Sequence, residues 1–241
     1  DFLERLHERY PALLIEGCSG GGGRFDAGML YYTPQIWCSD NTDAVERIKI
    51  QYGTSFAYPS CTVGSHVSAV PNHQTGRTTE LATRAAVAMA GSFGYELDLN
   101  LLTEEEKEQV RAQIKNYHRF EMLIRQGRYY RLTDVWQKKE YAAWEYCRPD
   151  GSEALVTVVT LDTQCNPATE YVKLRGLGED KKYRVEVVGM QTGGENGQRI
   201  NGTPNSVEPE YYTGAQLVHA GLPLPRLGNE YKSWQVYVKE V

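Results

Sequence analysis

Residues 12–26 read ALLIEGCSGGGGRFD, a short apolar run that leads directly into four consecutive glycines. The run at residues 12–16 has the length and composition of a buried strand, and the glycines follow its end. Four adjacent glycines cost conformational entropy on folding, so a close approach to the backbone explains them better than a flexible hairpin. A phosphate loop would need a Gly-Lys-Ser/Thr ending, which is missing. We therefore expect a ligand to approach the glycine run at the carboxyl end of this strand.

Strands and helices continue to alternate up to Gly127. Runs at residues 34–37, 54–58 and 92–97 predict three more strands. A helix is predicted from the spacing of Val45, Ile48 and Tyr52, with Gly53 as its stop, and another at residues 79–90. A capping box at residues 103–106 begins a third helix, which stops at Gly127. Strands separated by helices pair in parallel, so we expect an α/β layer.

Beyond Gly127 the chain shows short runs rich in Tyr, Val and Thr, separated by Gly, Pro and Asp. This pattern predicts an antiparallel β-sandwich with strands at residues 154–161, 170–174, 183–188 and 233–238. A turn of helix is expected within residues 207–221. We place the boundary between Gly127 and Asp134, which gives an α/β domain at residues 1–130 and an all-β domain at residues 131–241.

Composition and charge exclude several partners. The 241-residue chain has a net charge of −5, so it has no electrostatic reason to bind nucleic acid or an anionic membrane. No apolar run is long enough to cross a bilayer.

Five widely spaced cysteines favour a reducing compartment over a disulfide scaffold. The chain opens inside a predicted helix, so we expect that it has lost a preceding segment. A zinc site is an open alternative, although a close ligand pair is absent; its ligands would be Cys18, Cys38, Cys61 and His66.

A second polar cluster, residues 37–43, follows the predicted strand at residues 34–37. Capping of the next helix accounts for Thr42 and Asp43, but it does not require Asp40 or the aromatic Trp37. An aromatic neighbour disfavours the charged form of a carboxylic acid, which suits general-acid work. Asp40 is therefore a candidate catalytic acid.

A third cluster, residues 65–74, follows the predicted strand at residues 54–58. Its Ser–His pair would suit a hydrolase triad, but the Gly-x-Ser-x-Gly elbow is missing. Ordinary loop hydrogen bonding explains the cluster better, and His66 or His73 could still line a sugar pocket.

Together these motifs resemble the α-galactosidases of glycoside hydrolase family 36. The resemblance runs nearly end to end. It rests on Cys-Ser-Gly-Gly-Gly-Gly-Arg-Phe-Asp at residues 18–26, Tyr-Tyr at 31–32, Pro-Gln-Ile-Trp at 34–37, Ser-Asp-Asn-Thr-Asp-Ala at 39–44 with Glu-Arg at 46–47, residues 64–74 with Arg77, and Tyr-Thr-Gly-Ala-Gln-Leu at 212–217 with Gly-Leu at 221–222.

The resemblance implies the second half of a (β/α)8 TIM barrel, strands five to eight, followed by a C-terminal antiparallel sandwich. Half a barrel leaves two open edges, expected near Leu13 and Phe93. The family's acid/base matches Asp40, and its galactose contacts match Cys18 and Gly20. The family's nucleophile lies in a Lys-Trp-Asp motif that this chain lacks. Cys38 stands where many members have Thr.

The function expected from the resemblance is retaining hydrolysis of terminal α-galactosyl groups, as in melibiose or raffinose. Asp40 would be the general acid/base, and we expect Cys18, Gly20, Trp37 and Asp43 to bind the substrate. No cofactor or metal is expected. The partners would be the missing N-terminal half and further copies in a homo-oligomer, such as the family's tetramers, in a bacterial cytoplasm.

Two other readings remain open. The chain could be a carbohydrate-binding or scaffolding module without turnover, although such a module does not need Asp40 after a buried strand. Alternatively, Asp40 and Asp43 could form the catalytic pair themselves. Three residues apart at a helix start, their carboxyls would face one side of the sugar, whereas a retaining mechanism needs them on opposite faces.

Overall fold

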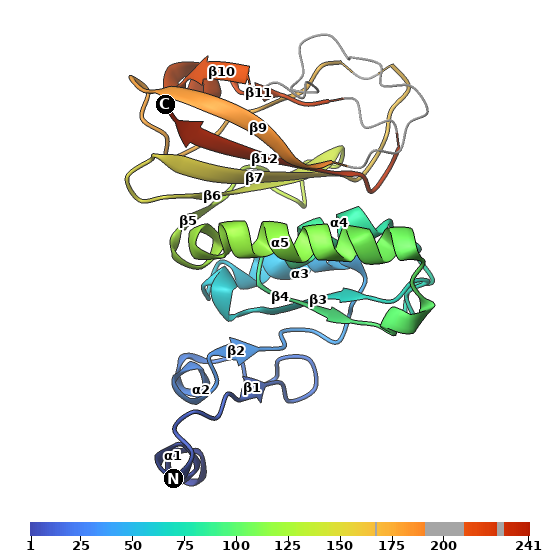
Figure 1. Cartoon of the computed structure of the whole chain (residues 1–241), viewed down its shortest axis with the longest axis vertical. Helices are drawn as coiled ribbons and strands as arrows, with labels where there is room; N and C mark the ends of the chain where they lie inside the picture. The colour runs from blue at the N-terminus through green and yellow to red at the C-terminus, as the bar shows by residue number, and fades with distance from the viewer. Residues whose placement is uncertain (167, 191–209, 226–228) are drawn as a thin grey trace. The chain divides into compact units, whose positions relative to one another are not determined.

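The computed structural model describes residues 1–166, 168–190, 210–225 and 229–241. Two compact units make up the chain: Asp1–Thr78 with Val87–Asp98, and Thr79–Ala86 with Leu99–Val241. Among the described residues, no helix combines the length and the apolar composition needed to span a bilayer. The first unit carries parallel strands separated by helices, and the second is built around an antiparallel sheet (Figure 1).

The first unit contains two pairs of parallel strands. β1 pairs with β2 and β3 pairs with β4, while a single parallel bridge between Ile36 and Val63 links the two pairs. The strands at either end, β1 and β4, each have one neighbour among the described residues. Its elements are α1 (Phe2–Arg9), β1 (Glu16–Gly17), α2 (Ala27–Tyr32), β2 (Gln35–Ile36), α3 (Ala44–Thr54), η1 (Ser60–Thr62), β3 (Gly64–Ser68) and β4 (Ser92–Glu96).

The third strand was predicted in the wrong place. Residues 54–58 end α3 and form a turn, whereas β3 is Gly64–Ser68. Aromatic side chains gave the turn the composition of a strand, but they make ring contacts instead: Tyr58 stacks on Phe25 and Phe56 meets Tyr52 edge-on. The first strand is also shorter than expected. It begins at Glu16, and the exposed Leu13 and Leu14 precede it.

Helix boundaries follow the local signals closely. α3 continues through Gly53 and ends one residue later, at Thr54. The predicted capping box is present, since the Thr103 hydroxyl accepts from the Glu106 N–H and the Glu106 carboxylate accepts from the Thr103 N–H. The last two helical elements before the sheet are η2 (Leu99–Leu101) and α5 (Glu104–Gln126), and α4 (Leu81–Ala88) is divided between the units.

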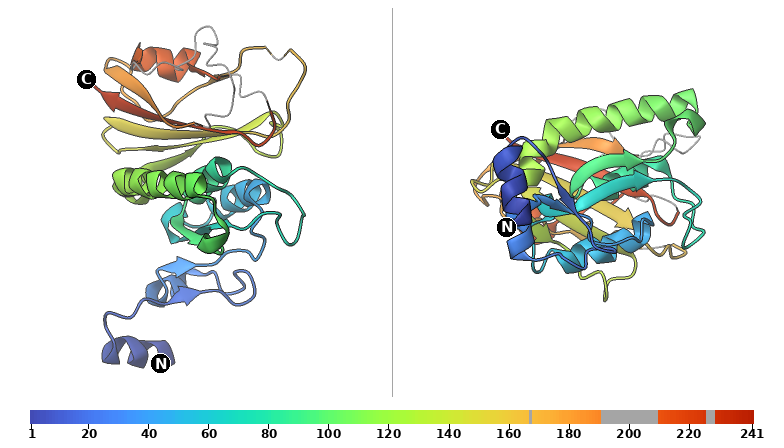
Figure 2. Two further views of the ribbon diagram at one scale, coloured as in Figure 1. Left: turned by 45° about the vertical axis from the view of Figure 1, so that its right-hand side comes forward. Right: turned by 90° about the horizontal axis from the view of Figure 1, so that it is seen from below.

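The second unit is a six-stranded antiparallel sheet in the order β10-β9-β12-β7-β6-β5, faced by a small β8–β11 pair. α5 lies along one face, and the π-helical turn η3 covers the other (Figures 1 and 2). The strands are β5 (Arg128–Arg131), β6 (Tyr141–Cys147), β7 (Glu153–Thr160), β8 (Tyr171–Val172), β9 (Lys182–Met190), β10 (Glu210–Thr213), β11 (Leu222–Pro223) and β12 (Ser233–Glu240), with η3 at Gln216–Ala220.

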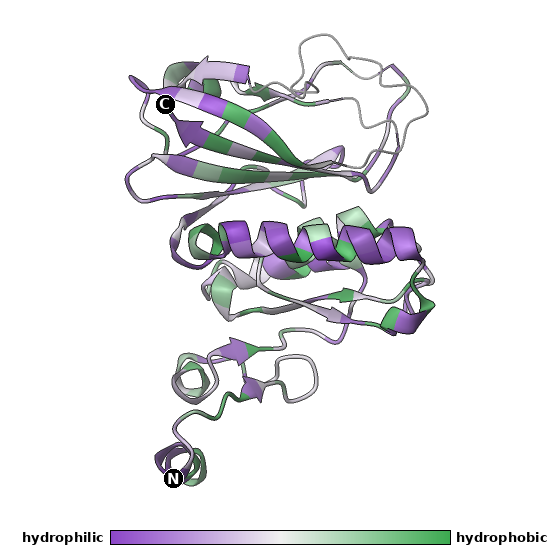
Figure 3. Ribbon diagram, in the orientation of Figure 1, coloured by the Kyte–Doolittle hydropathy of each residue, from purple (hydrophilic) through white to green (hydrophobic). Residues whose placement is uncertain are grey.

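The four strands predicted beyond Gly127 overlap β7, β8, β9 and β12. The predicted helical turn corresponds to η3, but the same stretch also contains the strand β10, and residues 207–209 lie outside the described residues. Figure 3 shows polar and apolar residues alternating along the sheet, as expected for strands with two different faces. The core on the η3 side is apolar and fully buried around Val156, Leu217 and Trp234.

Among the described residues of this unit, one carboxyl group is buried. Glu145 on β6 is 0% exposed, and its Oε2 accepts from the Arg175 N–H at 2.8 Å, while Oε1 has no partner in the described structure. Burial raises the pKa of Glu145 to about 8, against a smaller lowering by Arg175. The raised pKa favours the neutral form of Glu145 at neutral pH, and a neutral carboxyl group is less costly to bury than a charged one.

Candidate active site

The glycine run forms a left-handed turn. Four successive residues, Ser19 to Gly22, have positive φ values of 65°, 67°, 73° and 92°. The N–H of Gly22 donates to the Cys18 carbonyl and that of Gly23 to the Ser19 carbonyl, each at 3.2 Å. A left-handed backbone costs residues with a Cβ about 1–2 kcal/mol each, which explains why glycine fills most of the turn.

The turn packs against the backbone that carries Asp40. A Cβ placed on Gly21 would lie 3.0 Å from the Asp40 backbone nitrogen and 3.3 Å from its Cγ. A Cβ on Gly22 would lie 2.9 Å from Cys38 Cα. The structure therefore brings the first two sequence clusters together, beyond the carboxyl ends of the paired strands β1 and β2.

Gly20 differs from its neighbours because a Cβ there would meet no atom within 4 Å. Cys18, Gly20 and Asp40 are all exposed. No described side chain donates a hydrogen bond to the Asp40 carboxylate, so this carboxylate is free to meet a ligand. Its place is set through the backbone, where the Asn41 N–H donates to Ser39 Oγ at 3.2 Å.

Asp43 has a different environment. It is 3% exposed and caps α3, since its Oδ1 accepts from the N–H groups of Val45 and Glu46. Arg77 donates to Oδ1 at 2.6 Å, and the Thr75 hydroxyl donates to Oδ2. Burial alone would raise the pKa of Asp43, but the hydrogen bonds from Thr75, Glu46 and Arg77 and the charge of Arg77 lower it. Its donors leave this carboxylate little capacity for a sugar, so direct substrate binding by Asp43 stays a prediction.

The third sequence cluster divides into a strand and a loop. Ser65 and His66 belong to β3 and do not follow a strand, which corrects the expected placement. Asn72, in the loop beyond β3, donates to Thr42 Oγ1 at 2.9 Å, and its own Oδ1 accepts from the N–H groups of Gln74 and Thr75. This loop holds the residues that cap α3, while His73 is exposed.

Trp37 is part of a stack of side chains. Its ring stacks on His66 with centroids 4.7 Å apart, and the Arg47 guanidinium carbon lies 4.6 Å from the Trp37 ring centroid. His66 Nδ1 is 2.8 Å from Glu96 Oε2. The Trp37 ring thus contacts His66 and Arg47, and its predicted roles beside Asp40 and in substrate binding stay predictions.

The alternative zinc site is not assembled. Among the described residues, no group of three or more His, Cys, Asp or Glu side chains is placed to hold a metal, and all five cysteines are free.

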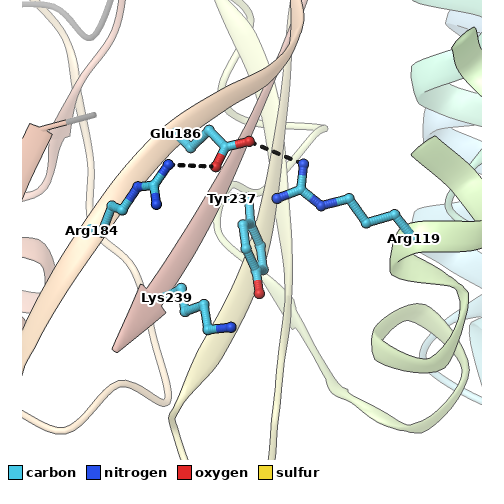
Figure 4. Close-up of a pocket in the computed structure, with 5 residues that line it drawn as sticks. All are labelled: Arg119, Arg184, Glu186, Tyr237 and Lys239. Atoms are coloured by element: carbon cyan, nitrogen blue, oxygen red, sulfur yellow. Dashed lines mark hydrogen bonds and ion pairs between the residues drawn. The ribbon is translucent and has the colours of Figure 1, made fainter. Parts of the chain in front are cut away.

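A separate pocket of about 250 Å³ lies in the second unit (Figure 4). Its lining comes from α5, β9 and β12: Arg119, Arg184, Glu186, Tyr237 and Lys239. The Glu186 carboxylate is engaged by Arg119 at 3.0 Å and by Arg184 at 3.4 Å. Because the Glu186 carboxylate is already paired with two cations, this pocket does not suit general acid/base chemistry.

Sequence reasoning missed four residues that hold the site: Arg47, Asn72, Thr75 and Glu96. Arg47 and Asn72 stand within the family motifs, but the spacing of those motifs does not indicate which groups the two side chains bind. Each has a partner 8 to 32 residues away in sequence, as with Arg47 to Ser39 and Thr75 to Asp43.

Comparison with known proteins agrees with the motifs. The profile of the Melibiase family matches residues 1–127, and that of the glycosyl hydrolase family 36 C-terminal domain matches residues 141–238. The bifunctional α-galactosidase/sucrose kinase AgaSK of Mediterraneibacter gnavus is 54% identical over 100% of this chain. The α-galactosidase AgaA of Geobacillus stearothermophilus is 43% identical over 99% of it. The chain spans 24% and 30% of the lengths of these two relatives.

Solved structures show the same fold. The galactosidase domain of AgaSK covers 100% of this chain with a TM-score of 0.88, and the chain covers 31% of that domain. A variant of AgaA in complex with raffinose covers 99% with a TM-score of 0.87, and the chain covers 30% of it. The predicted fold class, half of a (β/α)8 barrel followed by an antiparallel sandwich, is confirmed. Since the first profile matches more than half of its residues, this chain belongs to the melibiase family of glycosyl hydrolases, family 36.

Proposed function

We propose that the full-length protein containing this chain is a retaining α-galactosidase and that Asp40 is its general acid/base. One observation carries the proposal: the exposed Asp40 carboxylate has no donor among the described side chains and adjoins the left-handed glycine turn beyond β1 and β2. Barrel enzymes build their sites at the carboxyl ends of strands. The names of AgaSK and AgaA, and the raffinose bound to AgaA, indicate the substrate class.

In this mechanism a carboxylate outside the chain attacks the anomeric carbon, while Asp40 protonates the departing glycosidic oxygen. Asp40 then deprotonates a water molecule, which displaces the enzyme carboxylate, and two inversions give net retention. Asp43 is a poor candidate for the second carboxylate because it is buried and held by four donors.

The remaining residues have supporting roles in the proposal. The open space over Gly20 would admit the galactose, with Cys18 beside it. Trp37 and Asp43 would border the substrate while holding the loop between them. We also propose that the full-length protein works in the cytoplasm as a homo-oligomer, completed by its N-terminal half and without a cofactor. The free cysteines suit a reducing compartment.

The test is Asp40→Asn in the full-length protein. An amide is nearly isosteric but cannot deliver a proton, so activity on melibiose should fall by about 10²–10⁴-fold. The first step should suffer less with nitrophenyl α-galactoside, because its leaving group hardly needs a proton. Azide needs no base, so it should restore turnover of this substrate and yield α-galactosyl azide.

Asp43→Asn is the matched control, and azide should not rescue it. Rescue of Asp43→Asn but not of Asp40→Asn would show that the two roles are exchanged. If the unmodified full-length protein binds α-galactosides without any turnover, the proposal fails and the binding-module reading replaces it.

A further inference from the structure

Arg47 is a cation in an electrostatically unfavourable place. It is only 3% exposed and lies in the first turn of α3, where the positive end of the helix dipole opposes it. Among the described residues, no carboxylate lies within ion-pair distance of its guanidinium. Burial lowers the pKa of Arg47, and its contact with the Cys38 side chain offsets part of this. Burying a cation without a counter-ion costs free energy. The hydrogen bonds of the Arg47 guanidinium must offset this cost, so their acceptors indicate what Arg47 does.

Those hydrogen bonds go to two separate backbone segments. Nη1 donates to the Ser39 carbonyl at 3.1 Å, and Nη2 donates to the Gly64 carbonyl at 2.6 Å. Ser39 directly precedes Asp40, while Gly64 is the first residue of β3. The planar, rigid fork of a guanidinium suits two such acceptors, whereas an ammonium lacks that geometry. Arg47 therefore ties the loop before Asp40 to a strand of the sheet.

The same guanidinium also contacts the Trp37 ring, two residues before Ser39. It lies 4.6 Å from the Trp37 ring centroid, and Trp37 stacks on His66, which pairs with Glu96 at the end of β4. The segment before Asp40 is thus held to β3 by Arg47 and by the Trp37–His66 stack, and His66 connects that stack to Glu96 of β4. The Asp40 carboxylate has no donor of its own among the described side chains, so its position depends on this backbone support.

We propose that Arg47 is a positioning residue for Asp40: by binding the Ser39 carbonyl and stacking on Trp37, it sets where the acid meets the leaving oxygen. This inference rests on the proposed function. A displacement of about 1 Å in a catalytic group costs on the order of 10²-fold, so losing the clamp should weaken proton transfer specifically.

The test uses the full-length protein and aryl α-galactosides whose leaving groups differ in acidity. The readout is the slope of log kcat/KM against the pKa of the leaving group. Arg47→Lys should lose about 10- to 100-fold on the poorest leaving group and much less on nitrophenyl galactoside, which steepens the slope. Partial unfolding cannot imitate this result, because it lowers every rate in a sample by the same factor.

Two variants frame the measurement. Asp40→Asn should give the steepest slope, and Lys49→Gln, which removes an exposed cation from the same helix, should leave the slope unchanged. If Asp40→Asn does not steepen the slope, the proposed role of Asp40 fails. If Asp40→Asn steepens it but Arg47→Lys loses activity equally on all substrates, only the positioning role fails.

A double variant gives a second criterion. If Arg47 acts through Asp40, Arg47→Lys should cost little further activity in the Asp40→Asn background, because coupled residues are not additive. Full additivity would overturn the inference. Should Arg47→Lys not fold, Arg47→Gln replaces it, and failure of both to fold would show that Arg47 serves the fold and not the acid.

Discussion

Gly21→Ala probes the contact between the glycine turn and the acid. Gly21 has φ +73°, and a Cβ there would lie 3.0 Å from the Asp40 nitrogen and 3.3 Å from its Cγ. Two separate costs follow. The left-handed backbone should cost about 1–2 kcal/mol of stability. The new methyl group should also push the Asp40 backbone by a few tenths of an ångström.

The two costs can be separated with Gly76→Ala. Gly76 has φ +69°, nearly the same backbone strain, but a Cβ there meets nothing within 4 Å. Both variants should therefore lose a similar amount of stability. Only Gly21→Ala should lose activity, by about 10-fold or more on melibiose, since each 1.4 kcal/mol of lost transition-state stabilisation is a factor of ten.

The assay measures thermal unfolding of the full-length variants and kcat/KM on melibiose and nitrophenyl α-galactoside. Gly20→Ala adds a third arm, because its Cβ would enter open space. If galactose occupies that space, KM should rise with little change in stability beyond the backbone strain. Equal activities of Gly21→Ala and Gly76→Ala would refute the idea that the turn sets the position of Asp40.

Three further predictions follow from the structure. The pKa of Glu145 is raised to about 8, so between pH 4.5 and 8 the unfolded chain releases a proton that the folded chain keeps, and stability falls as pH rises by about 1.4 kcal/mol per unit. Glu145→Gln should abolish this slope, as unfolding midpoints at pH 5 and pH 8 would show; parallel pH curves for the two proteins would contradict it. Arg77→Gln should cost about 2 kcal/mol at neutral pH, because Asp43 loses a charged donor at 2.6 Å. The depressed pKa of Asp43 stabilises the fold above pH 3.8 and this contribution is lost as pH falls, so the variant should be less sensitive to acid; an unchanged acid titration of stability would contradict this. The 241-residue chain by itself should not hydrolyse nitrophenyl α-galactoside, because its proposed nucleophile lies outside it, and turnover near that of the full-length protein would be incompatible with this.

Local signals predicted most of the elements. The capping box at Thr103 and the stop at Gly127 depend on hydrogen bonds between residues three or four apart, and both are present. Strand β7 was readable because Val and Thr dominate it, and β12 because Trp234, Val236 and Val238 alternate with more polar residues. The prediction of a strand at residues 54–58 was wrong because the aromatic residues there have high strand propensity, although in the structure they pack within a turn.

β3 shows the opposite case. Its sequence Gly-Ser-His-Val-Ser has weak strand propensity, and the strand exists because it pairs in parallel with β4, some thirty residues away. Glu145 was not foreseen in the core either. A carboxyl group at that position is tolerated only because its surroundings keep it protonated, and the sequence carries no sign of those surroundings.

The sequence by itself determined the alternation of strands and helices up to Gly127, the change from parallel to antiparallel architecture and the family motifs that single out Asp40. These depend on periodicity, caps and residue identity, which act over a few neighbouring residues. Only the tertiary structure decided that Gly21 touches Asp40, that Arg47 clamps Ser39 and that Asp43 is enclosed by donors. Those contacts join segments up to 34 residues apart in the chain. Their geometry depends on how the backbone packs in three dimensions, and a pattern of neighbouring residues carries no information about that packing.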